Sequence, residues 1–540
     1  MFRENTSYQQ GDLFGFEHCL TEKQRKYFER STEATFFLEV FHKINEKDFA
    51  QLYSSSKSRP NVPVNQLVGA LILKHLNDWT YAELFNNLTF NALTRYAIGI
   101  TNSQQDIFSE ASIFNFQNRL IDHFNKTGED LINNVFISLT DKHLEKYKVN
   151  TSTQRGDSFL VDSKVIEYSR LRLFIEVLKR LQRILSKLDK QSIEEYVGPY
   201  DDQSSGYYVY SIRKQDITPH YEQIAQVYYS VYHILGEKYK DKEAYQTFLR
   251  VYKDYFRQGE RDDTIEIRPS NELESSKINS PDDLDATFSS KYGSTHIGYS
   301  THISETRHPD NKLELITDVV VVKNNVSDDR ILETRIDDMK TRMPDWEEYF
   351  VDGAYGNEKV DRLNKAHGIT QYQSAIKGRR SHSKLRIQKE DGKIWVSCGG
   401  GQKVSVQKTA KMYCAVFDNL ICETCPIKNK CRTKKCGGKF VKAKRLFYFT
   451  DKNILAHQRF MNIDQLPKER KTIRANVEAT VKEMKRGMKN GKVRVRRRIR
   501  VSMHMVFTAL GVNLRRIHLR LADFAIIFLF LDSHPSTYLR

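Results

Sequence analysis

The stretch at residues 313–322 limits the fold of this chain more than any other. Its sequence, LELITDVVVV, ends in a continuous run of β-branched residues, which is the pattern of a strand buried on both faces of a sheet. Further strand patterns occur at 157–166, 295–304, 349–352 and 369–375. Helical patterns separate several of these strands, so the alternation predicts an α/β core.

The rest of the chain divides into segments of different character. Residues 1–145 are predicted to form a helical N-terminal domain. A helical pattern from Leu171 to Leu188 opens a helical insertion at about 170–290. Residues 378–465 are rich in Lys, Gly and Cys, interrupt the alternation and are predicted to form an inserted module. The core is assigned to 150–377 and 466–520, with 468–516 helical and basic, and 521–540 is a C-terminal tail.

A helix-turn-helix pattern lies in the N-terminal domain. Apolar residues recur at helical spacing over 64–76. After a short break, Thr80 and Glu83 form a capping box for a second helix. This arrangement can place a helix in a DNA groove. It is also a common way to pack two helices, so both interpretations stay open.

The balance of charge indicates a polyanionic partner. The 540 residues carry a formal net charge of +18, with a pI near 9.3, and such a surplus of cations repels itself unless a polyanion offsets it. Ten Lys or Arg and one acid lie between Lys482 and Arg500. We expect this run to follow a DNA backbone rather than to form a solvated helix face. Its assigned DNA-binding residues are Lys482, Lys485, Arg486, Lys489, Arg494, Arg496, Arg497 and Arg498.

The sequence predicts neither export nor a membrane span. Its first residues lack a basic start followed by an apolar stretch. The longest apolar run, Phe524–Leu531, is too short to span a bilayer and is expected to pack as a buried terminal helix. Of seven cysteines, six lie between Cys398 and Cys436, which suits a reducing compartment. These patterns predict a cytoplasmic protein that works on nucleic acid.

Carboxylates near strand ends are candidates for metal-dependent phosphodiester chemistry. Two Mg²⁺ ions about 4 Å apart can activate water and stabilise charge on the reacting oxygens, and such cations prefer carboxylate ligands. Asp352 ends an apolar strand before a glycine turn, where open sheets place ligands, although the position also suits a helix N-cap. On the first strand Asp157 and Asp162 are both candidates for the metal site. They are five residues apart, so in a regular strand they lie on opposite faces and only one of them can point at the site. The apolar residues before Asp162 favour Asp162 on local pattern.

A third acid lies in the basic C-terminal part of the chain. Arg474, Glu478 and Lys482 are four residues apart, and Lys485 lies seven residues beyond Glu478. All lie on or near one face of a helix. By itself the pattern also suits a solvated ladder of ion pairs.

The clustered cysteines are a candidate structural zinc site. Cys422 and Cys425 have the Cys-x2-Cys spacing that supplies one side of a tetrahedral site. The second half is not a clean Cys-x2-Cys pair, so reduced structural thiols remain the alternative. The candidate zinc ligands are Cys414, Cys422, Cys425, Cys431 and Cys436.

In their order along the chain, these segments resemble the DDE transposases of bacterial insertion sequences. The closest pattern is the group with a Tyr-Arg-Glu-Lys signature around its third acid. Arg474, Glu478 and Lys485 have the spacing of that signature, whereas Lys471 occupies the tyrosine position. The segment RGDSFLVDSKVIEYSRLRL resembles the first-acid region and YFVDGAYGN the second-acid motif.

The resemblance implies a ribonuclease H-like core with a mixed sheet and a metal-binding trio. It assigns the first acid to Asp157 rather than Asp162, followed by Asp352 and Glu478. These three would hold two Mg²⁺ ions, with Mn²⁺ as a substitute. Arg474 and Lys485 would neutralise phosphates near the scissile bond.

The implied reaction is cleavage of the element's ends and joining of the freed 3′-hydroxyl to target DNA. The implied partners are double-stranded DNA and further copies of the chain on paired ends, within a bacterial cytoplasm at the nucleoid. Two alternatives remain. One is a ribonuclease H-like nuclease without strand transfer, and the other is a non-catalytic DNA-binding protein derived from a transposase.

Overall fold

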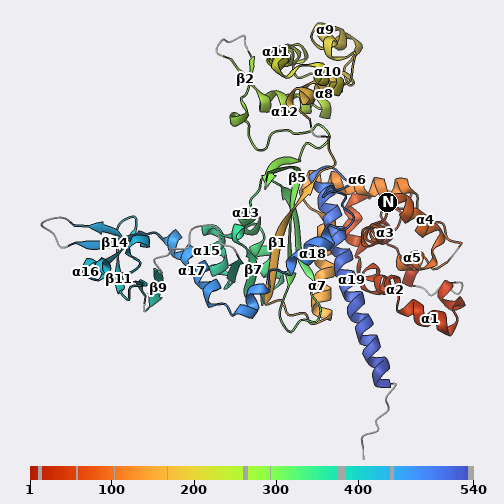
Figure 1. Cartoon of the computed structure of the whole chain (residues 1–540). Helices are drawn as coiled ribbons and strands as arrows, with labels where there is room; N and C mark the ends of the chain where they lie inside the picture. The colour runs from red at the N-terminus through yellow and green to blue at the C-terminus, as the bar shows by residue number, and fades with distance from the viewer. Residues whose placement is uncertain are drawn as a thin grey trace, which may run out of the picture.

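A sheet with both parallel and antiparallel strands forms the centre of the protein, and helices pack against it (Figure 1). The computed structural model describes residues 1–9, 15–55, 59–102, 104–166, 168–259, 265–291, 293–374, 385–390, 392–437 and 443–532. The central strands are β1 (Thr153–Asp162), β4 (Thr287–Lys291), β5 (Ser294–Thr306), β6 (Ile316–Lys323), β7 (Glu348–Asp352) and β8 (Thr370–Ser374). Their order is β4-β5-β1-β7-β8, with β6 also paired to β5. β5 is antiparallel to β1, β4 and β6, whereas β7 and β8 run parallel to β1.

Strand β1 begins and ends four residues before the predicted range of 157–166. Its first residues, Thr153 to Arg155, pair with β7 and are buried although they are polar, so an apolar pattern does not reveal them. Gly298 of β5 pairs with Asp162 at the end of β1, where the two strands approach each other closely. A Cβ at this position would lie 2.2 Å from the carbonyl oxygen of Val161, so only glycine fits.

Different helices cover the two faces of the sheet. On one face lie α7 (Leu131–Lys146), α18 (Val477–Met484) and α19 (Arg498–Asp532), which contact β6 and β1. The other face carries α13 (Asp328–Glu333), α14 (Ile336–Arg342) and α15 (Glu358–Ala366), whose apolar side chains pack with Tyr349 and Val351 of β7. Within β6, Val319 and Val321 are buried, and Val320 and Val322 are partly buried.

The N-terminal helices share one hydrophobic core with the central sheet. They are α1 (Glu22–Glu29), α2 (Thr32–Glu39), α3 (Val64–Leu76), α4 (Tyr81–Phe90), α5 (Ala92–Ala97) and α6 (Glu110–Thr127). α3 packs along α19, and apolar residues of both join those of β1, β5 and β6 in one cluster. The predicted capping box of Thr80 and Glu83 is present at α4. Since almost every residue of α3 is buried, α3 serves packing, and the boundary near 145 does not separate two cores.

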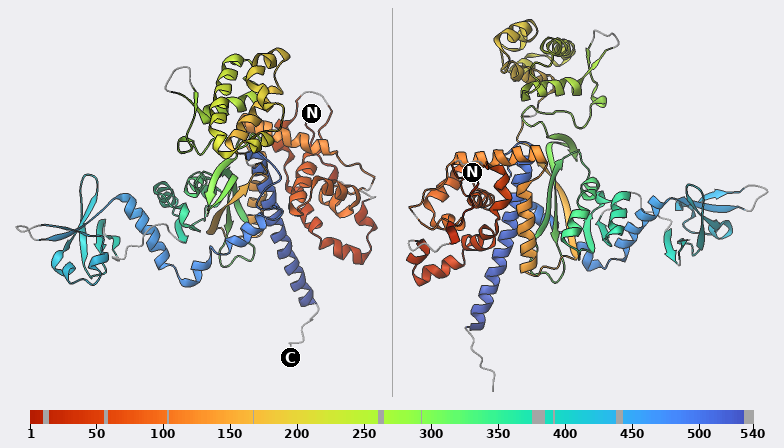
Figure 2. Two further views of the ribbon diagram at one scale, coloured as in Figure 1. Left: turned by 45° about the horizontal axis from the view of Figure 1, so that its top comes forward. Right: turned by 180° about the vertical axis from the view of Figure 1, so that it is seen from behind.

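The helical insertion has a hydrophobic core of its own. It contains α8 (Arg170–Gln182), α9 (Lys187–Val197), α10 (Ser205–Ser211), α11 (Ile217–Leu235), α12 (Glu243–Tyr255) and the short pair β2 (Phe256–Gln258) and β3 (Ile265–Ile267). The helical pattern of 171–188 is divided between α8 and α9, because Ser186 caps a new helix. Figure 2 shows this body standing apart from the sheet.

The cysteine-rich segment folds as a second six-stranded sheet. Its strands are β9 (Arg386–Glu390), β10 (Lys393–Ser397), β11 (Lys403–Lys408), β12 (Tyr413–Asp418), β13 (Lys434–Cys436) and β14 (Lys444–Phe449), in the order β13-β14-β12-β11-β10-β9, with α16 (Asn419–Glu423) beside them. A small core of its own supports it. α17 (Asp451–Gln465) then returns the chain to the central sheet and packs on β8 and α15, so the predicted module boundary at 465 falls one helix too late.

The basic stretch after α18 is not the continuous helix predicted for 468–516. Residues 485–497 are irregular, with left-handed backbone at Gly487, Asn490, Gly491 and Arg497, and glycine favours that conformation. α19 then runs through residue 521, where a boundary was predicted. The burial predicted for Phe524–Leu531 concerns side chains outside the described residues. Within the described chain, no helix has the length and apolar character needed to cross a membrane.

Candidate active site

Asp157 and Asp352 lie side by side on the parallel strands β1 and β7. The register pairs Arg155 with Phe350, and continuing it by two residues brings Asp157 opposite Asp352 on the same face. Burial raises the pKa of Asp157 above its ordinary value, and the negative charge of Asp352 raises it further, while Arg474 lowers it. The two carboxylates therefore form a charge-coupled pair at the edge where β7 ends.

Asp352 also caps the turn that follows its strand. Its Oδ1 accepts a hydrogen bond of 2.7 Å from the backbone N–H of Ala354, in the 3₁₀ turn η8 (Gly353–Tyr355). Asp352 is therefore the N-cap of this turn and also a candidate site residue. The cap fixes one oxygen and holds the carboxylate beside Asp157.

Asp162 lies at the far end of β1, away from this pair. Its carboxylate lies 3.0 Å from Nδ1 of His296, and its backbone N–H and C=O bond to Gly491 and Val493 of the basic stretch. The structure brings Asp157, rather than Asp162, to Asp352.

Arg474 spans the strands that carry the acids. One guanidinium nitrogen lies 3.1 Å from Oδ2 of Asp157, and the other donates to Oγ of Ser374 at 3.2 Å. Ser374 is the register partner of Asp352 on β8. Arg474, which lies in the turn before α18, therefore pairs with Asp157 of β1 rather than with Glu478.

Glu478 lies on α18, which packs over β1. The buried residues of α18 are Val477, Thr480 and Met484, whereas Glu478 is exposed. Arg474 precedes the helix and reaches Asp157 from a turn. At roughly 100° per residue, Glu478 lies on the same flank as Lys485, the residue after α18, on which the negative charge of Asp157 acts.

The three acids do not converge to metal-binding distance. Across the described residues, no three His, Cys, Asp or Glu side chains are grouped closely enough to hold a metal ion. Asp157 and Asp352 meet as a pair, and Glu478 lies on the helix beside them. The carboxylate oxygens of the pair nevertheless suit a hard divalent cation.

Lys485 lies partly buried between the site and the end of β1. Its ammonium sits 5.3 Å from the ring centre of Phe159. Burial lowers the pKa of Lys485, as does Lys291, while Asp162 and Asp157 oppose that shift. Lys485 therefore places a positive charge over β1, close to the acids.

A second polar layer under β1 was missed by the sequence interpretation. Ser158 Oγ lies 2.6 Å from the hydroxyl of Tyr355, which is 2.8 Å from Nδ1 of the fully buried His302. Asp328, the first residue of α13, adds a further carboxylate. Burial raises its pKa, Ser158 lowers it, and the charges of Asp352 and Asp157 raise it. In the sequence, the Ser-Asp-Asp run a few residues after the strand at 313–322 could have indicated Asp328 as a site residue.

A basic groove lies between the N-terminal helices and the stretch after α18. It has a volume of about 750 Å³ and includes the turn between α3 and α4. Its cationic lining residues are Lys74, Lys164, Arg494, Arg496, Arg497 and Arg500, and its aromatic ones include Trp79, Tyr81 and Phe114. The groove brings predicted DNA-binding residues together with the predicted helix-turn-helix.

Part of the predicted DNA-binding set is engaged within the protein. Arg496 donates to the carbonyl oxygen of Lys164, Arg497 pairs with Glu243, and the guanidinium of Arg498 stacks on Phe124. These contacts attach the basic stretch to its neighbours. The side chains of Lys482, Arg486, Lys489 and Arg494 are exposed.

The structure changes the predicted set of clustered cysteines. Cys422, Cys425 and Cys431 line one small cavity, together with Cys398, which the prediction omitted. Cys414 lies elsewhere, opposite Tyr448 in the sheet, and Cys436 is exposed on β13. The prediction of Cys414 and Cys436 in this group is wrong, because the strand register carries both away from the cavity.

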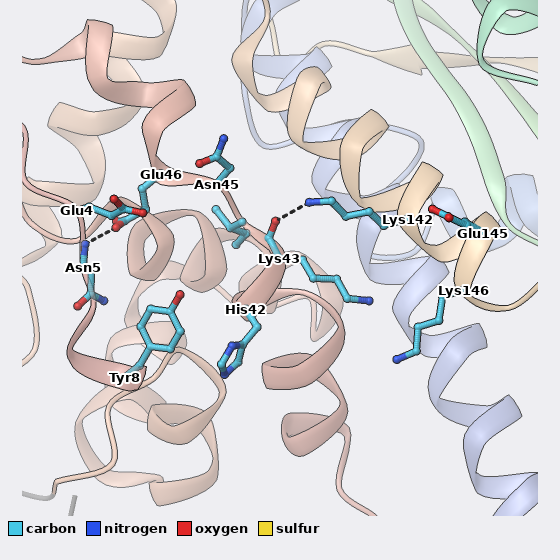
Figure 3. Close-up of a pocket in the computed structure, with 11 residues that line it drawn as sticks. Glu4, Asn5, Tyr8, His42, Lys43, Asn45, Glu46, Lys142, Glu145 and Lys146 are labelled. Carbon is cyan, nitrogen blue, oxygen red and sulfur yellow. Dashed lines mark hydrogen bonds between the residues drawn. The ribbon is translucent and has the colours of Figure 1, made fainter. Parts of the chain in front are cut away.

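A polar cavity in the N-terminal domain lies apart from all predicted site residues. It has a volume of about 760 Å³ and lies between the first residues of the chain and α7 (Figure 3). Lys142 of α7 donates to the carbonyl oxygen of Lys43 across it, at 3.3 Å. Acidic and basic side chains both line it, so its charge favours no one class of ligand.

Comparison with known families gives two matches. Residues 25–119, which run from within α1 to within α6, match the model of a transposase domain, DUF772. Residues 397–518, from the second sheet through α18 into α19, match the model of a transposase DDE domain. Neither the comparison with curated proteins nor that with solved structures gave a match.

Proposed function

Because its two matched domains make this chain an insertion-sequence DDE transposase, we propose that it cleaves DNA at the ends of an element and joins the freed 3′-hydroxyl to target DNA. The pairing of Asp157 with Asp352, beneath Arg474, carries this proposal. We assign the sheet, with three antiparallel strands beside two parallel ones, to a ribonuclease H-like core.

Asp157, Asp352 and Glu478 are the proposed metal ligands. Bound Mg²⁺ or Mn²⁺, in two ions, would activate the attacking oxygen and stabilise the charge on the leaving oxygen. The chain's own part is positioning: β1 and β7 fix two carboxylates, and α18 would bring the third to them. Arg474 and Lys485 place positive charge where a scissile phosphate would lie.

The basic groove is the proposed path for element or target DNA. Its cations suit a phosphate backbone, and the exposed Lys482, Arg486, Lys489 and Arg494 extend the same positive surface. Action on two paired ends calls for more than one copy of the chain, so we propose an oligomer on DNA. The bacterial cytoplasm, at the nucleoid, is the proposed site of action.

Strand cleavage tests the proposal directly. The probe is a duplex taken from the DNA that flanks the gene, inspected first for terminal inverted repeats. With Mg²⁺ the protein should nick it, and Asp157→Asn, Asp352→Asn or Glu478→Gln should each lower the rate about 10²–10³-fold. Asp162→Asn is the matched control, since its carboxylate pairs with His296.

The outcomes separate the alternatives. Equal nicking by the wild type and Asp352→Asn would exclude the proposed chemistry. Nicking without joining to a target plasmid would support a nuclease, and DNA binding without nicking a non-catalytic protein. Loss of activity in Asp162→Asn but not in Asp157→Asn would reverse the assignment of the first acid.

We also propose a structural zinc ion in the second sheet. Its ligands would be Cys398, Cys422, Cys425 and Cys431, because these four line one cavity and thiolate ligands suit tetrahedral zinc. Since no three of them are grouped within metal-binding distance, zinc would have to draw the thiolates closer together. A Cβ on Gly400 would lie 3.1 Å from the Cys425 sulfur and 3.7 Å from that of Cys398, so both sulfurs lie against one glycine.

A further inference from the structure

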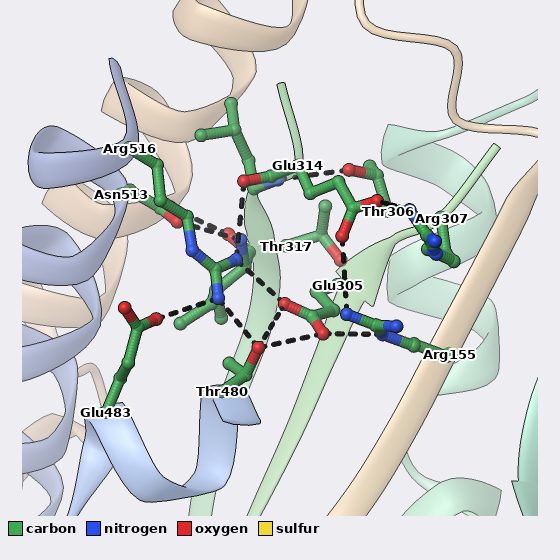
Figure 4. A network of polar contacts seen from close by, with 12 residues as sticks. Arg155, Glu305, Thr306, Arg307, Glu314, Thr317, Thr480, Glu483, Asn513 and Arg516 are labelled. Atoms are coloured by element: carbon green, nitrogen blue, oxygen red, sulfur yellow. Dashed lines mark hydrogen bonds and ion pairs between the residues drawn. The ribbon is translucent and has the colours of Figure 1, made fainter. Parts of the chain in front are cut away.

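A buried ionic network lies beside α18 (Figure 4). It is centred on β5, on the other side of β1 from the strand β7 that carries Asp352. Its centre is Glu305 of β5, which has no exposed surface. One carboxylate oxygen lies 2.6 Å from Nε of Arg155 and the other 2.8 Å from a guanidinium nitrogen of Arg516. The hydroxyl of Thr480 donates to the same carboxylate at 2.8 Å.

The network holds both ends of the segment that carries Glu478. Ahead of α18, Arg155 of β1 donates to the carbonyl oxygen of Ile473 at 3.0 Å. Towards the end of α18, Arg516 of α19 donates to Thr480 at 2.7 Å and to Glu483 at 2.9 Å. Strands β1 and β5 and helices α18 and α19 are thereby connected through Glu305.

The network also fixes how α18 is turned about its axis. Thr480 and Glu483 lie on the flank that Arg516 contacts, and Glu478 and Lys485 lie on the opposite flank, at roughly 100° per residue. Because Thr480 is held to Glu305 of β5, the direction of Glu478, about 160° further round the helix axis, is fixed as well. Arg155 precedes Asp157 by two residues on the same face of β1, so one carboxylate orients both the helix and the strand.

We infer that Glu305, Arg155, Arg516 and Thr480 are positioning residues for the proposed active site. They set the rotation of α18 so that Glu478 faces Asp157 and Asp352. The inference rests on the proposed function. Buried ion pairs often stabilise a fold no better than apolar residues of similar size, so a role in geometry accounts for this network better than a role in stability.

Thr480→Val tests the inference, because valine keeps the size of the side chain and removes the hydroxyl. Nicking of the flanking duplex should slow about 10- to 100-fold, and the Mn²⁺ concentration needed for half-maximal rate should rise. The affinity for the duplex should stay unchanged, and Thr480→Ser should restore the rate. The matched control is Thr508→Val, since that hydroxyl bonds only within α19, to the carbonyl oxygen of His504.

Four results would decide the matter. Wild-type rate and metal dependence in Thr480→Val would overturn the inference, and so would an equal loss in Thr508→Val or a failure of Thr480→Ser to recover. An inactive wild type, indistinguishable from Asp352→Asn, would instead remove the proposed function and the inference with it. Melting temperatures of all variants, measured beside the rates, identify any loss due to unfolding.

Discussion

The two six-stranded sheets of this protein are held together in different ways. In the central sheet, neighbouring strands come from distant parts of the chain, and Arg474 meets Asp157 across 317 residues. Helices cover both of its faces, and charged side chains such as Glu305 are fully buried. In the second sheet, all pairings are antiparallel, and the ion pair of Lys403 with Glu390 is exposed.

The central sheet therefore depends on contacts between residues that are far apart in the sequence, whereas the second sheet depends on contacts within one segment of the chain. The acid pair depends on the register between β1 and β7, which buried contacts hold. The second sheet has its own small core and thiol cluster. We therefore expect changes in buried charge to disturb the central sheet strongly and the second sheet little.

Loss of a buried carboxylate should have the largest effect. Glu305→Gln leaves Arg155 and Arg516 buried beside a neutral amide, so the free energy of unfolding should fall by about 3–5 kcal/mol. The matched change in the second sheet, Glu390→Gln, removes an exposed pair and should cost about 1 kcal/mol or less. Urea denaturation of both variants measures the contrast, and equal losses would remove the distinction between the sheets.

Acid should weaken the central body by a smaller amount for each buried histidine. Burial lowers the pKa of His302 and of His504 from 6.5 to about 4. A lowered folded-state pKa gives stability that is present above pH 6.5 and is lost as the pH falls towards 4. Between pH 7 and pH 5 each histidine should cost about 2 kcal/mol.

Denaturation at several pH values, monitored by circular dichroism, tests this dependence. His504→Phe fills the same space without a titratable group and should remove about half of the combined slope. A slope unchanged by that substitution would show that His504 is not the group responsible.

The thiol cluster should affect the central sheet least of all. Cys398→Ser or Cys425→Ser should abolish zinc binding by the purified protein, whereas Cys414→Ser and Cys436→Ser should retain it. The central body should change by less than about 0.5 kcal/mol in each case, because surface and distant changes rarely exceed that value. Wild-type protein that contains no zinc after purification in metal-free buffer would exclude the site.

Most strands of the central sheet could be predicted from the sequence because they follow local apolar patterns. Asp352 stood out because it ends one of these patterns. Asp157 did not stand out, since the start of β1 is polar and is buried through partners such as Glu305, so its assignment came from the resemblance. Cys398 and Asp328 escaped prediction because their neighbours in space lie far away in the chain. The irregular stretch at 485–497 was mistaken for helix because its density of Lys and Arg conceals the effect of two glycines.

The long separation between Asp157 and Arg474 has a consequence for protein synthesis. Arg474 follows Asp157 by 317 residues, which corresponds to roughly 15–60 s of translation at ordinary speeds. Until α18 and α19 emerge from the ribosome, β1 lacks Arg474 and Glu305 lacks two of its partners. A nascent chain therefore carries an incomplete acid site almost to the end of its synthesis, and under the proposed function a message cut short before α18 would yield an inert product.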